Sequence, residues 1–315
     1  MSLFALIAAL LLEQLQPLSS RKRLDGWLFS YAGFFRHHFN AGEHRHGKIA
    51  WLLAVVPLLS GIMALSWLLH YMHPFLAWLF NVFVLYLTMG FRQFSHYFTD
   101  IHQALRNGEL DEARRLLSDW RGESAQELNT EEVARVAIEE ALLASQRNVF
   151  GVITWFVLFS ALGLGGASGA VLYRLGQLLH KHWCDETEPD NFAGDKFGLF
   201  AQQASCILEW LPIRLAAATF AIVGNFEDAA YCWRTQATSW PDSETGILLA
   251  SGAGALGVRL GMTIPQDHMP QDRPELGIGD DADTDFMQST IGLVWRSVVF
   301  WLILLLLLTL ASLLG

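Results

Sequence analysis

Residues 48–71 read KIAWLLAVVPLLSGIMALSWLLHY, and this apolar stretch determines the class of protein that the sequence encodes. It holds about 20 residues without an acidic side chain, which is the length of helix needed to cross a ~30 Å hydrocarbon core. Residues 75–91, FLAWLFNVFVLYLTMGF, form a second apolar and aromatic segment. Because the link at 70–74 is too short for a domain, the sequence predicts a transmembrane hairpin over 48–91.

The composition agrees with a membrane location and excludes several other classes. Of the 315 residues, 52% are hydrophobic and 17% are charged, whereas soluble domains carry about 25% charged residues. The net charge of −10 excludes a basic surface for nucleic acid, so we expect no nucleic-acid partner. The three cysteines predict no disulfide framework. We expect no bound metal, because zinc-ligand spacing is absent from the basic stretch that holds His37, His38, His44 and His46.

Three further segments are apolar enough to enter the bilayer. Residues 292–314 form a clear C-terminal span, with Arg296 placed to reach the interface. Residues 1–16 predict a short, uncleaved N-terminal helix. Residues 149–175 are rich in glycine and predict either one tilted crossing or a broken, re-entrant segment. The fold class predicted is an all-α integral membrane protein with about four to five transmembrane helices, spanning the inner (plasma) membrane several times.

The remaining segments predict helices outside the bilayer, within one membrane domain over 1–315. Residues 92–148 show the spacing of an amphipathic helix pair broken at Asn107-Gly108, followed by a helix with Thr130 as its N-cap. Residues 177–291 predict an amphipathic helical region, in which Pro212 should kink a long helix. Its last part, 262–291, contains three prolines and many acids and predicts an extended, mobile surface loop.

The distribution of Lys and Arg predicts the orientation of these segments. Residues 17–48 and 92–148 carry most of the basic side chains near the hairpin, so we expect both to be cytoplasmic. The side on which 177–291 lies depends on whether 149–175 crosses the membrane, and the sequence leaves both alternatives open.

Residues 254–261, GALGVRLG, place one arginine among small residues. They predict a small-residue helix packed against a neighbour, from which Arg259 projects into a polar pocket shared with Arg214 and Glu139. A guanidinium near a bilayer needs an anionic partner. Candidates for that partner are Glu139, Glu209, a lipid head group, and a carboxylate or phosphate of a substrate.

The same stretch, followed by PELGIGD at 274–280, resembles the C-terminal signature of the CobD/CbiB family. Segments that resemble this family also lie upstream in the same order, at 107–122, 131–145, 151–175 and 208–224. Family enzymes join adenosylcobyric acid to aminopropanol or its phosphate through an ATP-dependent amide bond. The resemblance therefore implies ATP and Mg²⁺ as cofactors if the chain is such an adenosylcobinamide-phosphate synthase, and an anionic or corrinoid-like small molecule as a partner beside the lipid bilayer.

Several acidic positions of the family are replaced in this chain. Phe150 stands where the resemblance places an aspartate, His180 lies in the segment that replaces an Asn-Thr-Leu-Asp-Ser-Met motif, and Ser205-Cys206 replaces an acidic pair. The N-terminal His-Pro-Val pattern is also missing. Because carboxylates hold Mg²⁺ against phosphates, these losses disfavour catalysis, and no catalytic residue is assigned. The substrate-binding residues that the resemblance implies are Glu139, Arg174, Arg214 and Arg259.

The same loss of acids marks AmpE, a divergent relative that acts as a membrane sensor. Residues 209–216, EWLPIRLA, resemble an AmpE pattern that includes the tryptophan. The interpretation favoured by the sequence is a non-catalytic, AmpE-like sensor or regulator of the β-lactamase and cell-wall response. The alternative is the cobalamin-biosynthesis synthase, and a third is a membrane scaffold without a ligand.

Overall fold

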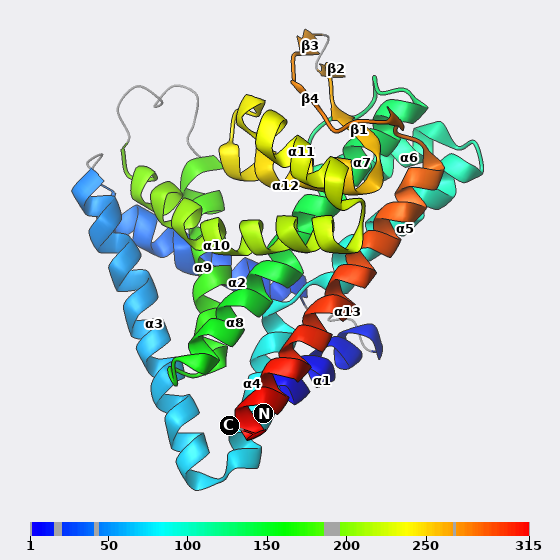
Figure 1. Ribbon diagram of the computed structural model, residues 1–315. Helices are drawn as coiled ribbons and strands as arrows, with labels where there is room; N and C mark the ends of the chain where they lie inside the picture. The colour runs from blue at the N-terminus through cyan, green and yellow to red at the C-terminus, as the bar shows by residue number, and fades with distance from the viewer. Residues whose placement is uncertain (1, 16–20, 41–43, 186–195, 267–268, 315) are drawn as a thin grey trace. The chain divides into compact units, whose positions relative to one another are not determined.

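The structure is a computed structural model that describes residues 2–15, 21–40, 44–185, 196–266 and 269–314. These residues are mainly helical, with a few short strands, which confirms the predicted all-α class (Figure 1). They fall into two compact units. The first unit is drawn from Met1–Met89 and Gly151–Leu211, and the second from Gly90–Phe150 and Pro212–Gly315. The single domain predicted for 1–315 stays a prediction.

The described residues of the first unit form helices joined by short turns and loops, and they include no strand. Its helices are α1 (Ser2–Leu15), α2 (Arg21–Phe39), α3 (His44–Met72), α4 (Pro74–Thr88), α8 (Gly151–Ala161), α9 (Gly166–Asp185) and the first half of α10 (Leu199–Val223). Helices α1, α3 and α4 lie where the N-terminal helix and the two arms of the hairpin are predicted, and α4 is one of the shorter apolar helices, so the crossing of the membrane by both arms stays a prediction. His73 lies at the tip of the hairpin, where its ring Nδ1 accepts a hydrogen bond from the backbone N–H of Phe75 (3.1 Å). Pro74 then begins α4, the position at which proline suits a helix.

The glycine-rich segment 149–175 is broken into two helices, so a single tilted crossing is wrong. Gly163 and Gly165 adopt φ values of +72° and +82° in the turn between α8 and α9. A side chain would be strained in this left-handed region, which explains the choice of glycine. The two helices then pack closely, because a Cβ added at Gly169 would collide with the carbonyl oxygen of Trp155. Trp183, near the end of α9, anchors the core of the unit by donating to the carbonyl of Ala32 (3.1 Å).

The second unit combines helices with short strands. Its helices are α5 (Phe91–Arg106), α6 (Leu110–Arg121), α7 (Thr130–Ser145), a π-helical turn (Gln146–Phe150), the second half of α10, α11 (Phe226–Gln236), a 3₁₀ turn (Ala237–Ser239), α12 (Ser243–Leu256) and α13 (Thr284–Leu314). The break predicted at Asn107-Gly108 is confirmed. The predicted N-cap Thr130 is wrong by one residue. Asn129 caps α7, because its side chain accepts from the N–H of Glu132 (2.9 Å), whose carboxylate accepts from the N–H of Asn129 (2.7 Å).

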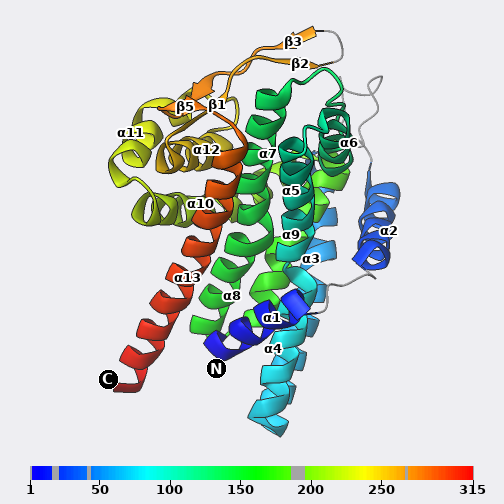
Figure 2. The same cartoon turned by 90° about the vertical axis from the view of Figure 1, so that its right-hand side faces the viewer.

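The stretch 254–261 is not one helix, contrary to the prediction. Gly257 adopts φ +70° and caps α12 with its backbone N–H on the carbonyls of Ala253 and Gly254. Glycine accepts this left-handed cap at no steric cost, so the helix ends at Leu256. The small residues still permit close packing, since a Cβ added at Gly254 would meet the backbone of α11. Both views show α11 and α12 side by side (Figures 1 and 2).

The predicted loop 262–291 is also wrong, because most of it forms strands and the start of α13. The strands are β1 (Val258–Gly261), β2 (Ile264–Gln266), β3 (Met269–Gln271), β4 (Glu275–Leu276) and β5 (Asp280–Asp281). β1 lies at the centre of a three-stranded sheet, antiparallel to β4 and parallel to β5, with Arg259 opposite Asp281. β2 and β3 form a separate hairpin (Figure 2). The sheet therefore brings charged residues of β1, β4 and β5 together.

Among the residues that the structure describes, four helical stretches are long and apolar enough to cross a membrane, and the chain is a multi-pass membrane protein. They are Arg45–Met72, Thr130–Ala161, Leu199–Val223 and Thr284–Ala311. Helix α10 continues through Pro212, so this proline does not end it. Arg296 on α13 donates to the carbonyl of Val223 (3.0 Å), near the end of α10. The sidedness predicted for 17–48 and 92–148 stays a prediction, and residues 17–20 and 41–43 lie outside the described residues.

Candidate functional site

A buried carboxylate on α7 connects this helix to the strands of the second unit. The Glu139 side chain accepts hydrogen bonds from the backbone N–H of Gly261 (2.7 Å) and from both terminal nitrogens of Arg273 (2.7 and 3.2 Å). Arg273 also donates to the carbonyls of Gly261 (3.0 Å) and Met262 (3.2 Å). A bidentate arginine–carboxylate pair of this kind is strong and directional. Glu139 and Arg273 therefore fix the ends of β1 and β4 against α7.

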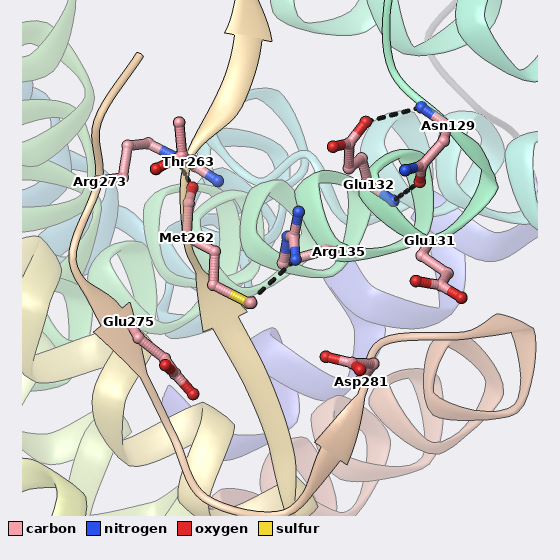
Figure 3. A pocket seen from close by; sticks show the side chains of 9 residues that line it. All are labelled: Asn129, Glu131, Glu132, Arg135, Met262, Thr263, Arg273, Glu275 and Asp281. Atoms are coloured by element: carbon pink, nitrogen blue, oxygen red, sulfur yellow. Dashed lines mark hydrogen bonds between the residues drawn. The ribbon is translucent and has the colours of Figure 1, made fainter. Parts of the chain in front are cut away.

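A polar pocket of about 530 Å³ opens beside this ion pair (Figure 3). This volume lies within the range of ~300–1,000 Å³ that is typical of small-molecule sites. The lining residues come from α7 and its N-cap, from β4 and β5, and from the connections β1–β2 and β3–β4: Asn129, Glu131, Glu132, Arg135, Met262, Thr263, Arg273, Glu275 and Asp281. Its walls therefore carry both carboxylates and guanidinium groups.

Arg259 organises the strand side of the pocket. Its terminal nitrogens lie 2.8 Å from a carboxylate oxygen of Asp281 and 3.7 Å from one of Glu275, and both acids line the pocket. Glu139 is not its partner, because that carboxylate is bound by Arg273. The prediction that Arg259 projects from a helix is also wrong, since it stands in the middle of β1. The strand register explains the pairing, because β1 places Arg259 directly opposite Asp281.

Arg135 lies on the helix side of the pocket and is 7% exposed. One terminal nitrogen donates to the thioether sulfur of Met262 (3.1 Å), and Nε has no hydrogen-bond partner. Figure 3 shows the two side chains facing each other, Arg135 from α7 and Met262 from the connection between β1 and β2. Met262 is also the one residue other than glycine with positive φ (+63°) in the described chain. Such backbone strain often accompanies functional sites.

The other predicted site residues lie elsewhere. Arg214 on α10 pairs with Glu244 at the start of α12 (2.6 Å), and neither residue lines the pocket. Arg174 belongs to α9 of the first unit and is half-buried. The predicted pocket shared by Arg259, Arg214 and Glu139 is therefore wrong. The substrate-binding role of Glu139, Arg174, Arg214 and Arg259 stays a prediction.

Two arginines of the site were not assigned from the sequence. Arg273 immediately precedes the PELGIGD stretch, and Arg135 stands one helical turn before Glu139. Arg273 also lines a second pocket of about 220 Å³, where its guanidinium carbon lies 5.6 Å from the ring centroid of Trp240. No group of three or more His, Cys, Asp or Glu side chains converges as a metal site among the residues that the structure describes.

The structure thus defines a multi-pass membrane protein with a charged pocket built on α7 and a small sheet. A family model described as CobD/Cbib protein matches residues 6–294. The chain belongs to the CobD/CbiB family. This family is the cobalamin-biosynthesis group whose activity is adenosylcobinamide-phosphate synthase.

Similar proteins carry names that agree with this membership. Cobalamin biosynthesis protein CobD of Stutzerimonas stutzeri is 36% identical over 97% of this chain and 98% of the relative. CobD of Chromobacterium violaceum is 33% identical over 79% of this chain and 76% of the relative. Cobalamin biosynthesis protein CbiB of Salmonella typhimurium is 26% identical over 82% and 80%, respectively. No solved structure shows significant similarity to the chain.

These comparisons correct the functional interpretation that the sequence favours. The AmpE-like sensor of the β-lactamase response is wrong, because the full-length similarity is to proteins named for cobalamin biosynthesis. The loss of particular acids weighs less than similarity along nearly the entire chain, since an acid can be supplied from another position. The synthase alternative is the one that the comparisons support.

Proposed function

We propose that this protein is the adenosylcobinamide-phosphate synthase of cobalamin biosynthesis, joining a corrinoid carboxylate to aminopropanol or its phosphate as an amide. The observation that carries the proposal is the 36% identity to a cobalamin biosynthesis protein CobD over 97% of the chain. An amide forms with loss of the elements of water, and ATP supplies the driving force by taking up that oxygen as phosphate. The membrane location is the same as that of the family.

The pocket in the second unit supports this function through its charges. Mg²⁺ is usually held by one or two carboxylates together with substrate phosphates, so a cluster of three acids is not required. Glu131, at the start of α7, has no hydrogen bond or ion pair among the described residues, and it lines the pocket with Glu275 and Asp281. These carboxylates would hold Mg²⁺ or the ammonium group of the amine. The donor set therefore fits an ATP-dependent ligase.

The acidic positions that are replaced in this chain do not line the pocket. Phe150 is fully buried and packs against Phe220 and Trp301, with ring centroids 5.8 and 5.5 Å away. His180 and Ser205 belong to the first unit. The carboxylates of the pocket come from other parts of the sequence, so replacements at 150, 180 and 205 leave its acids in place. This supports a retained enzymatic function.

The test is complementation of a bacterial strain that lacks the synthase, together with an assay of the purified protein. We expect growth that depends on corrinoid synthesis, and amide product that requires ATP and Mg²⁺. Glu131→Gln should lower product formation at least tenfold, whereas Glu112→Gln, which removes an acid exposed on α6, should leave it unchanged. A chain that accumulates in the membrane yet neither complements nor forms amide would refute the proposal.

A further inference from the structure

The charges of the pocket leave one cation without an anionic partner. Glu132 is engaged in the cap of α7, Asp281 and Glu275 face Arg259, and Arg273 is paired with Glu139. After these pairings, Arg135 has no carboxylate partner among the described residues. It is nevertheless more than nine-tenths buried and lines the pocket. The arrangement therefore offers a positive charge to a ligand.

The present partner of Arg135 is a poor one. A thioether sulfur is a weak acceptor, and a guanidinium carries five donors that suit the paired oxygens of a phosphate or carboxylate. A buried charge without an opposite charge is costly. An anion that reaches this position therefore gains binding free energy by pairing with the guanidinium. The unpaired Nε and the nitrogen on the sulfur, Nη1, are two of those donors.

The Met262 side chain can move away from the Arg135 guanidinium without a change in its backbone. Its backbone lies in the left-handed region, at φ +63°, a conformation that is strained for a residue with a side chain. Its neighbours hold that backbone, because Arg273 donates to its carbonyl (3.2 Å). The methionine side chain itself is flexible and adopts several rotamers at little cost. The thioether can therefore leave the guanidinium while the backbone remains in place.

We propose that Arg135 is the anion-binding residue of the pocket and that a phosphate group displaces the Met262 thioether from it. The anion site rests on the contacts alone, while the choice of phosphate rests on the proposed function. The phosphate belongs either to the nucleotide or to aminopropanol phosphate, since both carry the same chemistry. Glu131 then lies in the same pocket for the Mg²⁺ or the ammonium group that accompanies it.

The experiment measures binding to the purified full-length protein in detergent by titration calorimetry, which requires no turnover. The probes are inorganic pyrophosphate, Mg–ATP, aminopropanol phosphate, and aminopropanol without phosphate. Arg135→Leu should weaken at least one phosphate probe about 10- to 100-fold, the range expected for hydrogen bonds to a charged group. Arg135→Lys keeps the charge but loses the fork, and should weaken it less. Met262→Gly removes the competing sulfur and accepts positive φ, so it should tighten binding by a few-fold.

Arg115→Leu is the matched control, because it removes an arginine exposed on α6 and should leave binding unchanged. Loss for Mg–ATP alone identifies the nucleotide as the source of the phosphate, and loss for aminopropanol phosphate alone identifies the amine substrate. Unchanged binding of every phosphate probe to folded Arg135→Leu overturns the inference. If that variant does not fold, unchanged affinity in both Arg135→Lys and Met262→Gly overturns it instead.

The same data separate this inference from the proposed function. A wild-type protein that fails complementation but binds pyrophosphate through Arg135 refutes the synthase and retains the anion site. A wild-type protein that complements, with binding that is indifferent to Arg135, retains the synthase and refutes the anion site.

Discussion

Two glycine-rich stretches of similar composition have different roles in this protein. In the first unit, residues 163–169 turn the chain between α8 and α9 and let α9 approach the backbone of α8. In the second unit, residues 254–261 end α12, begin β1 and position Arg259 at the pocket. In both stretches the glycines provide left-handed conformations and close contacts. The difference lies in the groups that surround them.

The neighbours show which stretch contributes to a site. Around residues 163–169 the atoms nearest to the glycines belong to the Phe156 ring, the Phe159 Cβ, the Ser66 side chain and the Trp155 carbonyl, and none of these groups is charged. Around 254–261, the backbone N–H of Gly261 donates to the Glu139 carboxylate, and its carbonyl accepts a hydrogen bond from Arg273. A glycine stretch that serves helix packing alone needs apolar neighbours. A glycine stretch beside a site must also provide hydrogen bonds to the buried charged groups there.

The largest effect is expected where the second stretch is held by charges. Arg273→Met leaves the Glu139 carboxylate, which is 4% exposed, without its cation. Removing one partner of a buried ion pair typically costs about 3–5 kcal/mol. We expect a strong fall in membrane accumulation and in the thermal unfolding temperature in detergent.

The double variant Arg273→Met/Glu139→Leu supplies the control for that prediction, because it removes both charges. It should recover part of the lost stability. Arg115→Met, which removes the partner of the exposed Glu112, should have little effect. Equal losses in the Arg273 and Arg115 variants would contradict the distinction between the two stretches.

The next effect concerns packing in the first stretch. Gly169→Ala introduces a methyl group against the Trp155 carbonyl, so α8 and α9 must separate. Overpacking of this kind costs about 1–3 kcal/mol, and the unfolding temperature should fall accordingly. Gly163→Ala meets open space and carries only the strain of φ +72°, about 1–2 kcal/mol. Ligand binding by the pocket should survive in both variants, and a selective loss of binding would show that the first stretch also serves the site.

The sequence predicts the helical class and the membrane hairpin because these depend on local composition. Residues 48–71 are apolar enough to predict a span from their own side chains. The secondary structure of the two glycine stretches is harder to predict, because helices and turns use the same small residues. Only the left-handed φ at Gly163 and Gly257 distinguishes the turn from the helix. The sheet was missed because β4 and β5 have only two residues each, too few to show a period.

The candidate site could be predicted only in part, for a related reason. Glu139 and Arg259 are found from the resemblance, and the structure places both near the pocket. Their partners are distant in sequence: Glu139 binds a residue 134 positions away. The pairing depends on how β1 and the segment before β4 meet α7, which is tertiary information. Arg135 was missed because its distinguishing property is the absence of a carboxylate partner among the described residues.

A smaller effect is expected at Arg259, where charge and packing meet. Its side chain is 35% exposed, and its acidic partners are about half exposed, so solvent weakens both pairs. Such pairs contribute about 0–1 kcal/mol. Arg259→Leu should therefore accumulate normally and unfold at nearly the wild-type temperature. Because Asp281 and Glu275 lose their cation, the pocket becomes more negative, and binding of phosphate probes should weaken, more for Leu than for Lys. Loss of accumulation alone would instead make Arg259 a structural residue.

The least disruptive test uses Cys232 to report on the packing of α11 against α12. Burial, followed by the nearby Asp228 charge, raises the pKa of the Cys232 thiol to about 11. Because the thiolate is the reactive form, a rise from 9.0 to about 11 lowers the thiolate fraction at pH 8 about 100-fold. In a Cys184→Ser/Cys206→Ser background, alkylation should be very slow at pH 8, increase about tenfold per pH unit towards pH 10, and become fast on unfolding. The native thiol keeps its proton where the unfolded one loses it, so stability should fall as the pH rises from about 9 to 11.

Gly254→Ala should accelerate labelling by opening α11 from α12, while Gly169→Ala should leave it unchanged. Fast labelling of the unmodified fold at pH 8 would show that the glycines of the second stretch do not close this interface.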